Sequence, residues 1–330
     1  MKLTELIFIN LQLFADLNTN VTGDTGLSVE NKTFYDMTLI DEASPNLVHD
    51  QFGQKRPIPK NGGKKIEFRK FASLPKALTA LTEGVTPDGK KLSVTAIEAT
   101  VAQYGDYIVQ SDILELTTID NTIVEATKIL GRQAGLTLDT ITRNVLQSGT
   151  NVFYCPKADG TEVSARGDLD NTCKLTVDVV NRVVAILRAN NAPKINGDYV
   201  AIIHPYVSYD LRSDPAWVEA HKYATPENIY EGEIGKIGGV RFVETSEAKI
   251  YDGGVFGCLF LADGAYGITE ITGGGLQTII KQKGSAGTAD PLDQRSSIGW
   301  KAIKTAEILV QPYMMRVECK SAFSGDAEAN

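Results

Sequence analysis

Residues 53–91 read GQKRPIPKNGGKKIEFRKFASLPKALTALTEGVTPDGKK, and this stretch decides how the rest of the chain is interpreted. It contains ten lysines and arginines but only three acidic residues. Its net charge is therefore +7, in a chain whose total is −8, so the other residues sum to −15. Large apolar residues are too few for the stretch to form a core of its own. These features predict a long extension whose binding partner lies elsewhere.

Strand-like sequences flank a tip that is punctuated by glycine and proline. Residues 64–71 alternate, with Ile66 and Phe68 on one side and Lys65 and Arg69 on the other, which is the period of a β-strand. A second run, 92–109, is rich in β-branched residues and is interrupted at Gly105. The loop of about twenty residues between them is of a length that is usually functional or bound to a partner. We predict an extended β-hairpin.

The basic hairpin has two candidate partners, nucleic acid and another copy of the chain. Nucleic acid would attract it electrostatically, but a pI near 5.1 argues against a dedicated nucleic-acid-binding protein. The acidic remainder offers a complementary surface on another copy, and repeated contacts of that kind close into rings or shells. We favour self-docking, with apolar anchors that supply most of the free energy. The expected interface residues are Lys64, Lys65, Phe68, Arg69, Lys70, Phe71, Leu74, Lys76, Leu78, Leu81, Lys90 and Lys91.

Residues 118–149 carry the strongest helical pattern of the chain. Apolar residues recur every three or four positions and give one apolar face. Asp120 or Thr122 can cap its start, and Gly149 fits its end. Gly131 and Gly135, four apart, predict that another backbone crosses closely there or that the helix bends. The residues expected on the apolar face include Ile123, Ala126, Leu130, Ala134, Leu138, Ile141 and Val145.

Helices and strands alternate after residue 175, which predicts an α/β domain with a central sheet. Residues 273–297 read as a loop, and 298–313 return to strand character with an extension over 315–319. The expected elements in between are helices at 176–190 and 205–213 and strands at 199–204, 239–245, 256–262 and 266–271.

No arrangement of catalytic residues stands out. The histidines have no nucleophile motif near them, and there is no Walker A, G-x-S-x-G or H-E-x-x-H sequence. His204 is expected to pack or to cap a helix, so we predict no enzyme, no cofactor and no metal site. The four cysteines are far apart, which argues against structural zinc and for reduced thiols. The alternative is a hydrolase with a site near His204 and Asp210.

Secretion and adhesion are weaker alternatives. The apolar run near the N-terminus follows a single lysine, is interrupted by Glu5 and lacks an A-x-A site, so it is a poor signal peptide. Arg166-Gly167-Asp168 is the cell-adhesion tripeptide, but a charged turn in an exposed loop explains it more simply. No apolar run reaches the length of about 18 residues that a membrane span needs.

The order of these elements resembles that of the major capsid proteins of tailed phages with the Hong Kong 97 coat fold, and most closely the family of the phage N4 major coat protein. The resemblance spans roughly residues 34–315 and is more specific in its N-terminal half. It rests on residues 44–71, 81–94, 103–112 and 125–150, and more loosely on GKIGGVRFVETSEA (235–248), FGCLFLADGAYGI (256–268) and IGWKAIKTAEIL (298–309).

The resemblance implies a mixed α/β (α+β) coat-protein fold. It divides the chain into an N-terminal leader and arm (1–45), the hairpin or E-loop with its base (46–117), a peripheral domain with a long spine helix (118–175), an axial domain (176–284), and a return to the peripheral domain with the C-terminal tail (285–330).

The resemblance also implies a function, that of a major capsid protein. Subunits would form the hexamers and pentamers of an icosahedral shell around double-stranded DNA, without a cofactor. The implied partners are other copies of the chain, portal and scaffolding or decoration proteins, and packaged DNA bound non-specifically, with no membrane. The location would be the virion, after assembly in the bacterial cytoplasm. An encapsulin-like cellular shell is the alternative within the same fold.

Overall fold

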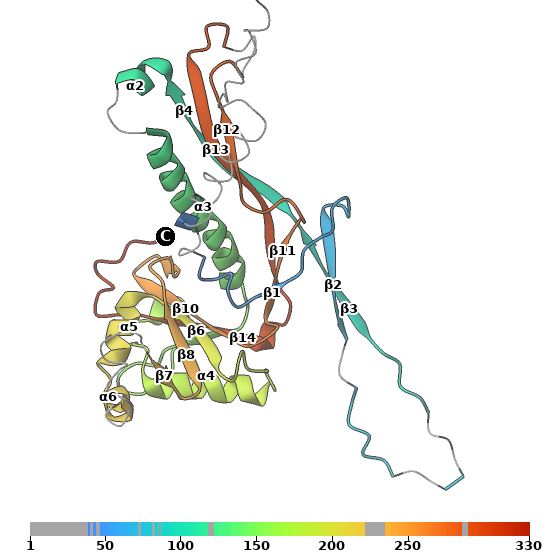
Figure 1. Cartoon of the computed structure of the whole chain (residues 1–330). Helices are drawn as coiled ribbons and strands as arrows, with labels where there is room; N and C mark the ends of the chain where they lie inside the picture. The colour runs from blue at the N-terminus through green and yellow to red at the C-terminus, as the bar shows by residue number, and fades with distance from the viewer. Residues whose placement is uncertain are drawn as a thin grey trace, which may run out of the picture.

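Helix α3 (Thr122–Gln147) runs along the molecule and packs against a sheet (Figure 1). The computed structural model describes residues 39, 42–43, 47–71, 74–80, 83–84, 86, 88–117, 122–221, 235–285 and 290–330. The predicted apolar face of the helix is confirmed: it meets Ile298, Trp300 and Ala302 in one core. Val145 is only half-buried. The helix residues in this core are Ala126, Leu130, Ala134 and Leu138, with Ile123 and Ile141 packed against it.

Gly131 explains how the chain passes over this helix. A Cβ at this position would lie 2.9 Å from the backbone oxygen of Leu39 and 3.0 Å from Cβ of Glu42. The predicted close crossing of another backbone is therefore confirmed, and it is made by helical residues 39 and 42. The remainder of the predicted arm, residues 1–38, 40–41 and 44–45, lies outside the described residues.

The sheet beneath α3 is organised by β13 (Arg295–Ile308), the longest strand described. It pairs antiparallel with β4 (Ala102–Ser111), β12 (Gln277–Lys281) and β11 (Tyr266–Glu270). Short β1 (Gln54–Lys55) adds to β11 in parallel. Strand β12 falls inside the stretch 273–297 that reads as a loop, so that prediction is wrong. Helix α2 (Asp112–Thr117) follows β4 at the far end of this sheet (Figure 1).

The second sheet has the order β5-β14-β10-β6-β8-β7, with β9 beside β10. Its central strands β10 and β6 are buried throughout. The predicted α/β alternation is confirmed, because α4, α5 and α6 accompany these strands. The elements are β5 (Val152–Tyr154), α4 (Val177–Ala189), β6 (Tyr199–Ile203), α5 (Pro205–Arg212), α6 (Pro215–His221), β7 (Lys236–Ile237), β8 (Val240–Glu244), β9 (Ile250–Tyr251), β10 (Val255–Leu261) and β14 (Met314–Cys319), with 3₁₀ turns at Arg166–Asp168 and Gln311–Tyr313.

The strands do not follow the expected boundary between the axial domain, which was to end at residue 284, and the peripheral part, which was to return at residue 285. Strand β14 was expected in the returning peripheral part, but it lies between β5 and β10 in the second sheet. Its apolar residues Met315, Val317 and Cys319 are buried in that core. Conversely, β11 and β12 were expected in the axial domain, but they pair with β13 in the first sheet.

The predicted hairpin is present and projects from the body (Figure 1). Strands β2 (Lys65–Phe71) and β3 (Val94–Thr100) pair antiparallel, with Phe68 opposite Ile97. The strand break predicted at Gly105 falls instead at Val101. Gly105 lies inside β4, where a Cβ would come within 2.5 Å of the backbone oxygen of Trp300, so the close approach of β13 requires glycine. None of the helices in the described residues is long and apolar enough to cross a membrane.

Candidate assembly interface

Phe68 fixes the root of the hairpin to the body of its own chain. Its side chain is only 4% exposed. A Cβ at Gly267 of β11 would lie 2.9 Å from its ring, and the guanidinium of Arg56 lies 5.9 Å from the ring centroid. The prediction that Phe68 contacts a neighbouring copy is therefore wrong, since its ring faces the body and is covered there. The residue instead sets where the hairpin leaves the body.

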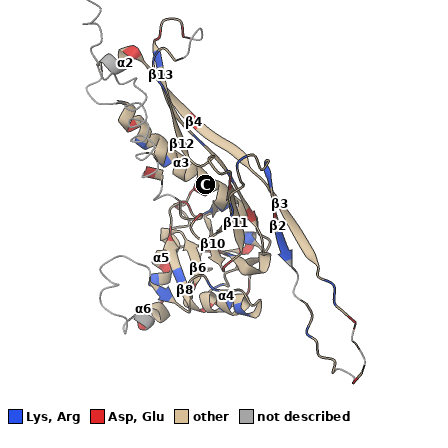
Figure 2. Cartoon of the chain, turned by 45° about the vertical axis from the view of Figure 1, so that its right-hand side comes forward, with Lys and Arg blue, Asp and Glu red and all other residues tan. Residues whose placement is uncertain are grey.

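The opposite face of the hairpin is charged and open to solvent. Lys65 lies 3.1 Å from Glu98 across the strands, and Arg69 lies 3.2 Å from Glu67. Exposed pairs of this kind contribute little stability. Lys64 and Lys70, which alternation places on the side of Phe68, are also exposed. Figure 2 shows blue for lysine and arginine along the hairpin. The cations of the opposite face are therefore paired within the hairpin, while Lys64 and Lys70 keep their positive charge open to a partner.

The outer part of the hairpin exposes apolar side chains without a core beneath them. Leu78 is 86% exposed, Leu74 52% and Leu92 68%. Lys76, Lys90 and Lys91 are exposed beside them. Leu81 and the side chain of Phe71 lie outside the described residues. A two-stranded ribbon is marginally stable alone in water, and a cluster of exposed apolar residues marks an interaction surface. This part of the chain therefore offers a surface for another molecule.

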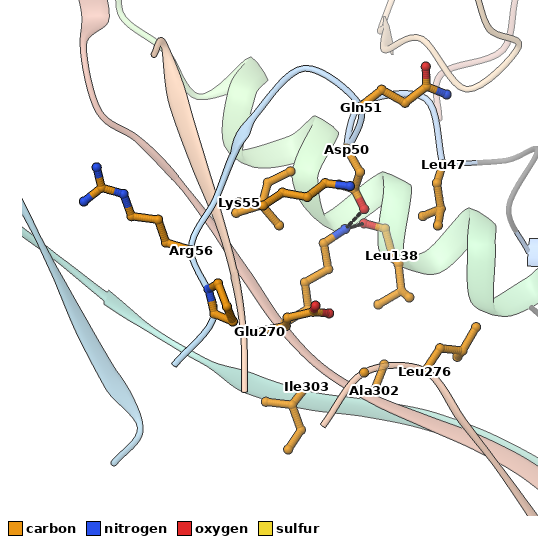
Figure 3. A pocket seen from close by; sticks show the side chains of 14 residues that line it. Leu47, Asp50, Gln51, Lys55, Arg56, Leu138, Glu270, Leu276, Ala302 and Ile303 are labelled. Carbon is orange, nitrogen blue, oxygen red and sulfur yellow. Dashed lines mark hydrogen bonds and ion pairs between the residues drawn. The ribbon is translucent and has the colours of Figure 1, made fainter. Parts of the chain in front are cut away.

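A buried ion pair holds the base of the hairpin against α3. The carboxylate of Asp50 accepts a hydrogen bond from Oγ1 of Thr142 (2.6 Å) and pairs with the ammonium of Lys304 on β13 (Figure 3). Lys304 also donates to the backbone oxygen of Leu138 (2.9 Å). Burial lowers the pKa of Lys304, while the charge of Asp50 opposes that shift. The ion pair thus joins the segment before β1, helix α3 and strand β13.

A second buried pair lies beside the first and is formed by His49 and Asp139. The backbone N–H of His49 donates to Oδ1 of Asp139 (2.7 Å), and its ring Nδ1 lies 2.7 Å from Oδ2 of the same carboxylate. Tyr266 donates its hydroxyl to the backbone oxygen of His49, and burial raises the pKa of Tyr266. Sequence reasoning missed this junction, because its residues are isolated in the sequence and meet only in the fold.

The residues of the alternative hydrolase site do not form one. Nδ1 of His204 accepts a hydrogen bond from the backbone N–H of Tyr206 (3.1 Å), which makes it the N-cap of α5, as predicted. Asp210 pairs with Lys174 (2.9 Å) and accepts from the backbone N–H of Ala322 (2.9 Å). Among the described residues no cluster of three or more metal-binding side chains occurs. The four cysteines are free and buried.

Acidification should destabilise the chain through His204. Burial lowers the pKa of this histidine below its ordinary 6.5. Below that value the unfolded chain binds the proton more readily than the folded one, so stability falls as the pH drops toward the folded pKa. His204→Asn keeps an N-capping side chain without this titration. Urea midpoints at about pH 7.5 and 5.5 should therefore differ less in His204→Asn than in the parent. An equal difference in both proteins would contradict the assignment.

The tripeptide Arg166-Gly167-Asp168 is not available in the way that an adhesion motif requires. The guanidinium of Arg166 donates to both carboxylate oxygens of Glu318, each at 2.6 Å. It also lies 3.6 Å from the centroid of the Tyr251 ring. The pKa of Arg166 is raised by the hydrogen bonds to Glu318. The arginine is therefore held by contacts within its own chain.

The projecting hairpin, the long helix packed on a sheet and the second sheet with its helices together define the Hong Kong 97-like coat-protein fold. A family model described as phage capsid protein matches residues 117–256. No curated protein matches the chain.

Solved phage capsids share this architecture at low sequence identity. The capsid of cyanophage Pam1 is 15% identical, with a TM-score of 0.66 over 85% of this chain and 92% of that one. The capsid of cyanophage P-SCSP1u is 13% identical, with a TM-score of 0.65 over 84% and 89%. The capsid of Ralstonia phage GP4 is 15% identical, with a TM-score of 0.62 over the same shares.

Proposed function

We propose that this chain is the major capsid protein of a tailed phage, a structural subunit without enzymatic activity. Copies assemble into hexamers and pentamers that form an icosahedral shell around double-stranded DNA. One observation carries the proposal: a hairpin whose root is locked into its own body ends in exposed leucines and lysines. The family match and the coat-protein fold agree with this function.

The hairpin reaches over a neighbouring copy and buries its apolar outer part there. Leu74, Leu78 and Leu92 supply the apolar contact, while the exposed lysines steer the encounter toward acidic surface. The base of the hairpin is fixed to the body, because Asp50 pairs with Lys304 and His49 pairs with Asp139. Repeated head-to-tail contacts of this type close into rings and shells.

The remaining parts of the proposal rest on the resemblance. Portal and scaffolding or decoration proteins and packaged DNA are the further partners, the virion is the location, and the host cytoplasm is the place of assembly. Kinship with the phage N4 coat protein rests on the sequence segments alone. The division into E-loop, peripheral and axial domains is proposed with changes, since β5 and β14 join the axial sheet and β11 and β12 join the peripheral one.

Electron microscopy of the purified protein tests the function. Protein concentrated with and without a crowding agent should form rings or closed shells. Strictly monomeric protein at every concentration would overturn the proposal. The content of shells isolated from cells separates a phage capsid, which holds DNA, from an encapsulin-like shell, which holds protein cargo.

A further inference from the structure

A pocket of about 330 Å³ opens where the base of the E-loop meets the body (Figure 3). Leu138 of α3, Leu276 of the β11–β12 loop and Ile303 of β13 give it apolar walls. Its floor holds the pair of Asp50 and Lys304. Lys55 points toward Asp50 across the mouth (Figure 3). The pocket thus combines an apolar interior with a cation at its entrance.

The segment that borders the pocket is cationic. Lys55, Arg56, Lys60 and Lys64 are exposed, and no acid occurs between residues 51 and 66. In the part of the chain that the structure describes, none of these three lysines has an ion-pair partner. Glu270 is the exposed acid on the pocket wall, and the exposed cations Lys55 and Arg56 outnumber it there, since Asp50 is paired with Lys304. An occupant of this pocket should therefore carry apolar side chains and negative charge.

Helix α2, at the far end of the peripheral sheet, has this character. It exposes Ile113 (67%) and Leu114 (45%), and its sequence DILELT contains two acids and no base. The acid at its start, Asp112, is half-buried, and Figure 2 shows red on this helix. The backbone N–H of Asp112 donates to the backbone oxygen of Gln294 (2.9 Å), which places the turn bearing Leu292, 75% exposed, beside the helix. Together these residues form an exposed apolar end.

The nearest lysines lie away from α2. Strands β4 and β12 pair with the same residues of β13, so they occupy its opposite edges. Lys281, at the end of β12, and Lys283 therefore lie two strands away from α2, which follows β4. Arg295 is engaged by Asp290 (3.8 Å). Among the described residues of this end, Asp112 thus has no free cation of the neighbouring strands beside it.

We propose that α2 of one copy docks on the E-loop-base pocket of another copy, with Ile113 entering the pocket and Asp112 facing Lys55. This contact rests on the proposed shell function and names a second site of self-association. The E-loop tip is the less suitable occupant, because Lys76, Lys90 and Lys91 would meet the cations at the mouth. Nucleic acid would pair with those cations but would leave the apolar walls uncovered.

Disulfide trapping tests the contact directly. Ile113→Cys and Leu276→Cys subunits are mixed, assembled and oxidised, and the natural cysteines are too buried to compete. We expect a covalent dimer in shells from this mixture. The control mixture pairs Leu276→Cys with Val218→Cys, whose site on α6 is also an exposed apolar one. The inference is overturned if shells form without the disulfide between positions 113 and 276, or if the control mixture forms its disulfide equally well. Either result leaves the shell function standing. Absence of shells from the parent would instead refute the function.

Charge exchange gives an independent readout. Lys55→Glu should slow shell formation about tenfold, a change of about 1.4 kcal/mol. Adding Asp112→Lys should restore most of the rate, because attraction between the two sites returns with reversed signs. Arg241→Glu makes the same charge change at an exposed site in the axial sheet and should leave the rate near that of the parent. Equal slowing by Lys55→Glu and Arg241→Glu, or no rescue, overturns the pairing.

Discussion

Deleting residues 72–90 should give a folded subunit that no longer forms shells. The described residues in this range are exposed, so the deletion removes no part of the three buried cores. Strands β2 and β3 remain, with residues 91–93 as a short turn between them, and Phe68 keeps the root in place. Circular dichroism and thermal unfolding should match the parent, while electron microscopy should show no closed particles.

A variant with a loop of equal length tests whether assembly needs only the length of the hairpin or also its leucine side chains. Replacing 72–90 by glycine and serine keeps the span but removes Leu74 and Leu78. This variant should also fail to assemble, because apolar burial supplies most of the free energy of association. Normal shells from the deletion would refute the E-loop assignment. Shells from the glycine–serine variant alone would show that the backbone, and not the leucines, makes the contact.

Replacing Glu318 by Gln should destabilise the axial sheet by about 3 kcal/mol, the cost typical of breaking a buried ion pair. The carboxylate of Glu318 has no exposed surface and lies 2.6 Å from Arg166 and 2.9 Å from Arg316. A neutral amide leaves both guanidinium groups without their counter-charge. Urea unfolding followed by the fluorescence of Trp217, which lies in the same core, measures the loss. A Trp300→Phe background removes the other tryptophan signal.

Glu307→Gln is the matched control. Glu307 is half-buried on β13, and burial raises its pKa, so its charge is unfavourable where it lies. Neutralising it should leave the urea midpoint unchanged or slightly higher. If Glu318→Gln unfolds at the parent midpoint as well, the Arg166–Glu318–Arg316 cluster contributes no net stability, and the argument from burial fails.

The periodicity of short sequence windows predicted those helices and strands whose structure depends mainly on their own residues. The apolar repeat of α3, the alternation of β2 and the cap provided by His204 are all visible in short windows of sequence. Gly131 even revealed the crossing backbone, because a glycine in a helix needs a reason to be there. Strand β12 was missed, since its five residues lie among glycines and gain their order from β13.

Partners that are distant in sequence could not be predicted. Alternation placed Phe68 on one side of its strand, but it did not tell whether the chain's own body or a neighbouring copy would cover that side. The same applies to the base of the E-loop, where His49 meets Asp139 and Asp50 meets Lys304. No pattern in the sequence relates these residues, because only the fold brings them together. Strand β14 joined the unexpected sheet for the same reason.

The place of β14 has a consequence for how the chain folds during synthesis. This late strand, Met314–Cys319, lies between β5 and β10, both of which leave the ribosome well before it. The axial sheet therefore stays incomplete until almost the whole chain has been made, and closing such long-range pairs is slow. A nascent subunit that stops before residue 314 lacks an internal strand rather than an edge, so it should be degraded instead of entering a growing particle. Late closure would thus restrict assembly to subunits whose translation has passed this strand.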